Sequence, residues 1–251
     1  MNGVATGLLV FAFLAGVSLL VLWLHPRLPS AHRSKETTDI IRLGIGVVAT
    51  IAALILALLI SSVKSSFDQV NHDVQQFARG LILTDRALRF YGPGAEGARD
   101  LLMRYTERAL HETWPEDKNK AIVQDPVAGA LLDQTEAAIQ ALQSEGRKPI
   151  QTAQAADAIH EVVRERWGLV EERGSAVSPT LVTALVLWLG LIFASFGYNA
   201  PRNAAVLLVL LVCAASVAGA VFMVLEMDGP FTGLITVPSD PVRRALAHMQ
   251  Q

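Results

Sequence analysis

Four long segments without a charged side chain place the strongest constraint on what this chain can fold into. They cover residues 4–24, 43–63, 177–198 and 203–225. A helix of about 20 residues crosses the hydrocarbon core of a bilayer, and each segment reaches that length. Because lipid offers no hydrogen-bond partners, a crossing segment must satisfy its own backbone groups, as a helix does. The pattern predicts four transmembrane helices, in two pairs that flank a long middle region.

The composition supports a membrane protein. Hydrophobic residues make up 52% of the chain and charged residues 18%, and the mean hydropathy is +0.39, which is apolar for a soluble protein. The first segment lacks a basic leader and is longer than the apolar part of a secretory signal, so we expect it to be retained. We therefore predict a multi-pass protein of the cell inner (plasma) membrane, with the lipid bilayer as a partner.

The middle region has the three-four spacing of apolar residues that indicates helices. No strand-like alternation of useful length appears in the chain. The predicted fold class is therefore an all-α membrane protein, with four transmembrane helices that flank a helical extramembrane domain. The predicted domains are 1–63 (two spans), 64–176 (the extramembrane domain), 177–225 (two spans) and 226–251 (an interfacial C-terminal tail).

The second span is predicted to continue out of the membrane as one long helix, because no proline interrupts residues 43–79. Val74 and Phe77 lie on the apolar stripe of this continuation. We expect them to pack against the last helix of the middle region or against a neighbouring subunit.

Several classes of function are disfavoured by the middle region. It holds more acidic than basic side chains, which argues against nucleic acid as a partner. His111 with Glu112 lacks the second histidine of a zinc-protease helix, and His160 with nearby glutamates is typical of a charged surface. We expect no catalytic residue, cofactor site or metal site, and we do not expect an enzyme.

Polar residues in the second span are candidates for the lining of a pore. They are Thr50, Ser61 and Ser62, the two serines at the membrane boundary. If this span lined the axis of an oligomer, Thr50 and the alanines around it would form a narrow, weakly polar path. In the alternative interpretation, the Thr50 hydroxyl only bonds back to a carbonyl of its own helix.

Two acids, Glu226 and Asp228, directly follow the fourth span. One interpretation is a tail latch, in which Asp228 caps a turn at Pro230, Phe231 lies in the interfacial layer, and two arginines meet headgroups or the acids. These arginines are Arg243 and Arg244. The alternative is an acidic ring at the mouth of a pore, which would attract cations.

Small residues recur every four positions in three of the spans. The rows are Gly3 with Gly7, Ala49 with Ala53 and Ala57, and, in the fourth span, Ala214 with Ala218, Ala215 with Gly219 and Ser216 with Ala220. Such rows let helices approach closely. They fit packing within one chain, and they equally fit a subunit interface or a pore lining.

The layout and three stretches resemble the bestrophin-like domain family of four-span membrane proteins. The stretches are R-L-G-I-G-V-V-A-T-I-A-A-L-I-L-A-L-L-I-S-S in the second span, L-L-M-R-Y at residues 101–105, and M-D-G-P-F-T-G-L-I-T-V-P-S-D-P-V-R-R-A-L near the end. In the last stretch, the residues that match the family pattern are Asp228, Pro230, Phe231, Gly233, Ile235 and Pro241. Gly229 stands where the family more often has arginine. The family name implies kinship with bestrophins, which are pentameric anion channels.

The predicted function is a homo-oligomeric ion channel whose middle region forms a vestibule or cap, with self and inorganic ions as partners. The alternative is a membrane-anchored scaffold or stress-sensing interaction protein without conduction. Basic residues flank the predicted spans on both sides, which leaves the side of the middle region open.

Overall fold

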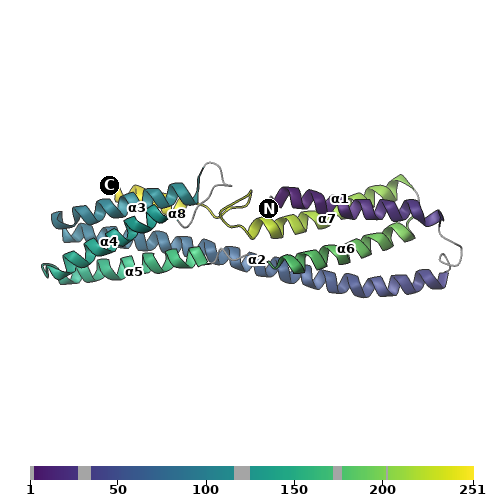
Figure 1. The fold of residues 1–251 in the computed structure, drawn as a ribbon, viewed down its shortest axis with the longest axis horizontal. Coiled ribbons are helices and arrows are strands. Elements are labelled where there is room, and N and C mark those ends of the chain that lie inside the picture. The colour runs from purple at the N-terminus through teal and green to yellow at the C-terminus, as the bar shows by residue number, and fades with distance from the viewer. Residues whose placement is uncertain (1–2, 28–34, 116–124, 172–176, 202) are drawn as a thin grey trace. The chain divides into compact units, whose positions relative to one another are not determined.

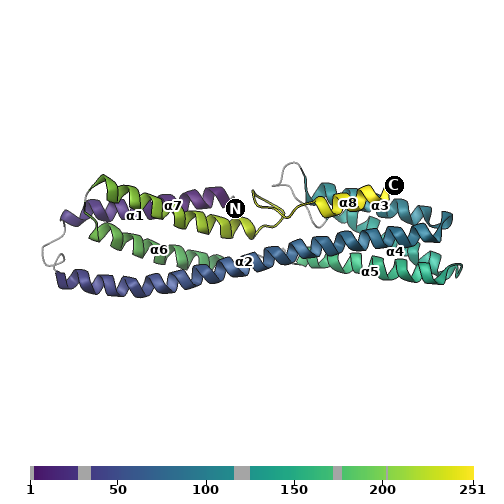
Figure 2. The ribbon, with the colours of Figure 1, turned by 180° about the vertical axis from the view of Figure 1, so that it is seen from behind.

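The computed structural model of the 251-residue chain describes residues 3–27, 35–115, 125–171, 177–201 and 203–251. Every regular element in these ranges is a helix (Figure 1; Figure 2 shows the reverse side). The elements are α1 (Gly3–Leu24), η1 (His25–Arg27), α2 (Lys35–Tyr91), η3 (Pro93–Ala95), α3 (Glu96–Thr113), α4 (Pro126–Ser144), α5 (Pro149–Glu171), α6 (Pro179–Asn199), α7 (Ala204–Met227) and α8 (Asp240–Met249). The predicted all-α fold class is confirmed.

Four of these helices, α1, α2, α6 and α7, are long and apolar enough to cross a membrane. Local sequence explains where two of them begin. Pro179 occupies the first turn of α6, where a missing N–H costs nothing, and the Asn203 side chain caps α7 by accepting from the Val206 N–H at 2.8 Å. The second span is part of α2, a helix of 57 residues, so its predicted continuation beyond the span is confirmed.

The chain divides into two compact units, and each is described by itself. The membrane unit comprises Met1–Ser65 and Ala176–Asp228, and the extramembrane unit comprises Ser66–Ser175 and Gly229–Gln251. Helix α2 contributes residues to both.

In the membrane unit, α1 packs against both α6 and α7. The contact with α6 is close because two glycines leave room for it. A Cβ at Gly197 would collide with the carbonyl oxygen of Ser18, and a Cβ at Gly190 would lie 2.8 Å from the Phe13 ring. Ser18 is buried there and donates its hydroxyl to the Phe193 carbonyl at 3.0 Å.

The small-residue rows divide between the interior and the surface of the membrane unit. Gly7 faces α7, since a Cβ there would lie 3.0 Å from Phe222 Cβ, and Ala214 and Ala218 are buried in the core. Ala57 and Ala215 are exposed. Packing within the chain therefore accounts for some of the rows and leaves others at the surface.

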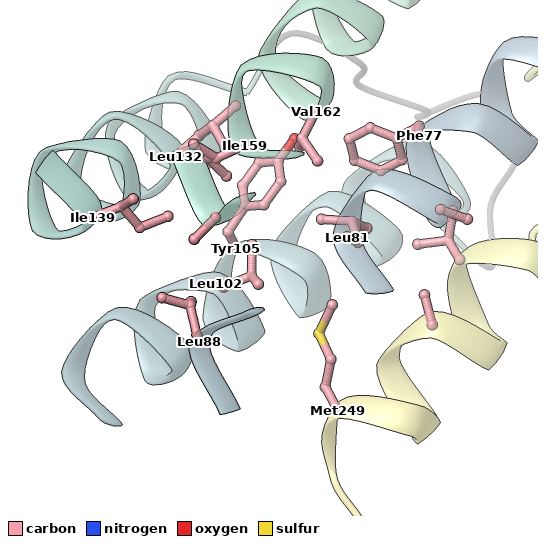
Figure 3. Close-up of a cluster of buried hydrophobic side chains, with 14 of the residues drawn as sticks. Phe77, Leu81, Leu88, Leu102, Tyr105, Leu132, Ile139, Ile159, Val162 and Met249 are labelled. Atoms are coloured by element: carbon pink, nitrogen blue, oxygen red, sulfur yellow. The ribbon is translucent and has the colours of Figure 1, made fainter. Parts of the chain in front are cut away.

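The extramembrane unit buries its core between α2, α3, α4 and α5 (Figure 3). The core includes Leu81, Leu102, Leu132 and Ile159, each no more than 2% exposed. Helices α2 and α5 approach closely at Gly80, where a Cβ would lie 2.8 Å from Val162 Cγ2.

Val74 and Phe77 belong to this core, with exposed fractions of 0% and 4%, so their predicted burial is confirmed. Their burial is provided by the chain itself. The Phe77 ring meets the Tyr105 ring of α3 edge to face, with 6.2 Å between ring centroids. Helix α3 is thus a partner beyond the two that the sequence predicts, the last soluble helix and another subunit.

The C-terminal segment also belongs to the extramembrane core, which differs from the interfacial tail that we expected. Phe231, Val237, Val242 and Met249 are buried in this core, and α8 packs on α3. Val242 and Met249 share one face of α8 because they are seven positions apart. The apolar residues of this segment are therefore buried by neighbouring helices of the extramembrane unit.

Candidate functional site

One face of α2 in the membrane unit is covered by none of the residues that the structure describes. Leu43, Val47 and Leu54 on this face are 75%, 62% and 61% exposed. On the opposite face, Leu59 and Val63 are buried in the core of the membrane unit. One side of α2 therefore packs in the core of the membrane unit, and the other side is exposed.

Thr50 lies in the middle of the open face. Ala57 follows it by seven positions and Ser61 by eleven, which places all three on the same side of a helix with 3.6 residues per turn. All three are exposed. Ser62 is exposed too, but it lies about 100° further round the helix. We define the open face as Leu43, Val47, Thr50, Leu54, Ala57 and Ser61.

The Thr50 hydroxyl donates to the Gly46 carbonyl of the same helix at 3.0 Å. This bond keeps the hydroxyl satisfied in an apolar setting, while its oxygen stays at an exposed position. The open face contains no ionisable side chain. It is therefore uncharged and weakly polar, with small side chains at Ala57 and Ser61.

The two acids at the end of α7 lie apart from the open face. Glu226 is 5% exposed, and a Cβ at Gly3 would collide with its Oε1 atom, so Glu226 packs against the start of α1. Asp228 accepts the backbone N–H of Val177 at 3.2 Å. An acidic ring at a pore mouth needs exposed carboxylates, so the burial of Glu226 differs from that expectation.

The remaining latch residues lie in the extramembrane unit. The Pro230 carbonyl accepts the Val237 N–H at 2.8 Å, which closes a turn. Phe231 meets the Trp114 ring edge to face at 5.5 Å between centroids. Arg243 Nε donates to the hydroxyl of Ser239, the residue just before α8, and Arg244 lines a groove beside α2.

The sequence analysis missed Gly190 and Gly197, which set the contact between α1 and α6. A signal was available, because two glycines seven positions apart lie on one face of a helix. A spacing of four positions, as in the other small-residue rows, does not reveal this pair.

The comparisons with known proteins agree with this architecture. A family model described as the bestrophin-like domain matches residues 12–242. A comparison with curated proteins finds no match.

Solved structures with a similar fold include a mutant bacterial bestrophin homologue from Klebsiella pneumoniae. It has a TM-score of 0.71 and 12% identity, and the match covers 97% of each chain. Another mutant of that homologue has a TM-score of 0.70 at 13% identity, covering 97% of this chain and 98% of the other. A third structure, described as a membrane protein, has a TM-score of 0.68 at 14% identity, covering 98% and 99%. At these identities the likeness shows a shared fold. Because the family model extends from α1 to α8, this chain belongs to the bestrophin-like domain family.

Proposed function

We propose that this protein is a homo-oligomeric ion channel of the inner (plasma) membrane, with the open face of α2 from each copy lining the path. The observation that carries the proposal is this face, which is uncharged, weakly polar and left uncovered by the described part of the chain. A narrow path lined by apolar and weakly polar side chains can gate by dewetting. The family membership supports a channel because bestrophins conduct ions.

The extramembrane unit supports assembly into an oligomer. Its part of α2 exposes Leu83 and Phe90, which are 47% and 62% exposed. Both line a groove of about 640 Å³ between α2 and α5. Charged side chains, Arg79, Arg86, Asp157 and Glu161, line the same groove, so it combines apolar and charged groups as protein interfaces do. In the proposed channel, neighbouring copies cover this surface and the extramembrane units form the vestibule.

Cysteine accessibility in planar bilayers tests the path. Cys213, the single cysteine, is exposed on α7, so Cys213→Ser provides the background. In that background, Thr50→Cys and Ala57→Cys should each let a charged methanethiosulfonate reagent block the current. The matched control is Val209→Cys, because Val209 is 59% exposed on α7 and faces lipid in this proposal. If the reagent blocked the current only in Val209→Cys, the ion path would not run along the open face of α2.

The second candidate is a membrane-anchored scaffold without conduction. It is favoured by the extramembrane groove that holds Leu83 and Phe90, which in this candidate function would receive a partner protein. Bilayer recordings of the purified wild-type protein under varied pH, calcium and membrane tension separate the two. An assembled oligomer that never conducts would support the scaffold.

A further inference from the structure

The extramembrane part of α2 borders two grooves. The first, between α2 and α5, is the groove that holds Leu83 and Phe90. The second has a volume of about 580 Å³ and lies between α2 and α8, with Asp240 and Arg244 of α8 in its lining. We call these the α2–α5 groove and the α2–α8 groove.

The two grooves flank one ridge of α2. Arg79 and Leu83 line both grooves, and both residues are exposed. From this ridge, the α2–α5 groove extends to Gly80, where α2 meets α5. The α2–α8 groove extends the other way, to Ala78 and Ile82. Figures 1 and 2 both show α8 on one side of this part of α2 and α5 on the other. The grooves therefore open on opposite flanks of the same helix.

A ring of identical copies needs two different surfaces on each copy. Each subunit touches one neighbour with the first surface and the other neighbour with the second, and the two surfaces must fit each other because every junction is the same. If the ridge of α2 turns toward the axis of the ring, its two flanks face the two neighbours. The α2–α5 groove of one copy then meets the α2–α8 side of the next. This step rests on the proposed function, which supplies an oligomer around an axis.

Charges of both signs line the α2–α5 groove, on opposite walls. Arg79 and Arg86 come from α2, whereas Asp157 and Glu161 come from α5, so the four charges sum to zero. The walls do not pair with each other: neither arginine forms an ion pair with a described residue, and Glu161 is bonded by Arg164 of its own helix. A partner that covers this groove therefore fits best with an acid toward α2 and a base toward α5.

The exposed face of α8 carries such a pair of charges. Asp240 and Arg244 are exposed and lie four positions apart, so they share a face of the helix with Ala247, which is also exposed. Within the described part of the chain, neither Asp240 nor Arg244 forms an ion pair. The other face of α8 is buried through Val242 and Met249. The acid and the base thus point away from their own unit.

We propose that the exposed face of α8 docks into the α2–α5 groove of the neighbouring copy. In this contact Asp240 lies against Arg86, and Arg244 lies against the acids of α5, either of which can pair with it. The same contact covers Leu83 and Phe90 of the neighbour. Because it repeats around the ring, every α8 joins its own extramembrane unit to the next one. The contact requires the oligomer but not conduction.

Cross-linking between copies in the membrane tests the contact. In the Cys213→Ser background, one copy carries Gln154→Cys, on the α5 wall of the groove, and a differently tagged copy carries Ala247→Cys. A short bis-maleimide should join them into a dimer with both tags. A chain that carries both changes should form a ladder beyond the dimer, as a ring does. In the matched control, Glu107→Cys replaces Gln154→Cys. Glu107 is exposed on α3 and lines neither groove, so no dimer should form.

Charge reversal tests the pair at the centre of the contact. Arg86→Asp and Asp240→Arg each place like charges against each other, so each should lower the cross-linked fraction several-fold. Asp240→Arg also puts a positive charge at the start of α8, where it is unfavourable. The deciding measurement is therefore the double variant, which restores opposite charges and should recover the cross-link. A double variant that stays as low as either single variant contradicts the pairing of Asp240 with Arg86.

The mass of the assembly and its current in bilayers are measured on the same preparations. An intact oligomer without the mixed cross-link overturns this inference and leaves the proposed function standing. A cross-linked ring that carries no current supports the inference and counts against the channel. Cross-linking of Gln154→Cys with itself would mean that two α2–α5 grooves face each other, which also overturns the inference.

Discussion

The backbone of Gly197 lies so close to Ser18 that no side chain fits between them. The same turn of α1 is tied to α6 by the hydrogen bond from Ser18 to the Phe193 carbonyl. In lipid, where apolar surface gives no drive for association, close packing and hydrogen bonds of this kind hold helices together.

The first prediction concerns this contact. Gly197→Ala places a methyl group against the Ser18 carbonyl and should destabilise the membrane unit by about 1–3 kcal/mol, the usual cost of overpacking. Gly219→Ala is the control, because a Cβ at Gly219 on α7 meets nothing within 4 Å. Thermal unfolding in one detergent should separate the two. Equal stability would show that α1 and α6 are not in close contact.

The second prediction concerns Asp125, which caps α4 and pairs with Arg108. Asp125→Ala should cost about 1–2 kcal/mol, as lost N-caps do. Asp125→Asn should cost less, because asparagine also caps helices. The control is Asp133→Ala, at an exposed position of the same helix. Chemical denaturation monitored by the extramembrane tryptophans would measure the differences.

The pH dependence follows from the same residue. The hydrogen bond from Arg108, followed by the backbone N–H groups of Ala128 and Val127, holds the pKa of Asp125 below its usual value. The contribution to stability is therefore present above the unfolded pKa of about 3.9 and is lost as the pH falls through the lower folded pKa. Asp125→Asn should flatten the decline in stability below about pH 4. A variant that declines as steeply as the wild type would contradict this.

The third prediction concerns the docking of the C-terminal segment. Trp114 Nε1 donates to the Val237 carbonyl at 2.9 Å. Trp114→Phe keeps an aromatic ring against Phe231 but removes this bond, so it should weaken docking by about 1 kcal/mol. Hydrogen exchange of residues 231–249 should speed up several-fold. Trp167→Phe is the control, since Trp167 is 59% exposed. Equal hydrogen-exchange rates in the two variants would show that the Trp114 hydrogen bond does not hold the C-terminal segment in place.

The fourth prediction concerns Asp85, a carboxylate that is 2% exposed. It accepts Arg89 Nη2 at 2.7 Å and Arg99 Nε at 2.8 Å. These arginines in turn donate to the His248 and Met249 carbonyls at the end of α8, where positive charge is favourable.

Asp85→Asn leaves both arginines without their anchor and should cost about 2 kcal/mol, in the range of hydrogen bonds to charged groups. We expect faster backbone hydrogen exchange in α8 and unchanged exchange in the other helices of the unit. Asp157→Asn, at an exposed position of α5, should change neither quantity. If α8 remained protected from hydrogen exchange in Asp85→Asn, other contacts would be sufficient to hold this helix in place.

The transmembrane architecture could be predicted because charged side chains are excluded from lipid. Each span therefore appears in the sequence as a long segment without charged residues. Val74 and Phe77 could be predicted because the period of a helix selects its buried face. The position of the C-terminal segment could not, since Phe231 and Val237 suit a membrane interface and a protein core equally well. The edge-to-face contact of Phe77 with Tyr105 depends on how two separate helices, α2 and α3, pack together, and no pattern within one helix reports that.

The burial of Phe231, Val237 and Met249 also bears on biosynthesis. These residues are translated after α6 and α7, whereas the helices that receive them are made before either. The ribosome must therefore deliver the last two spans before the extramembrane core can close. Until then, the apolar surface that later contacts Phe231, Val237 and Met249 stays uncovered on the earlier helices. During that period it is open to a chaperone or to a neighbouring nascent chain.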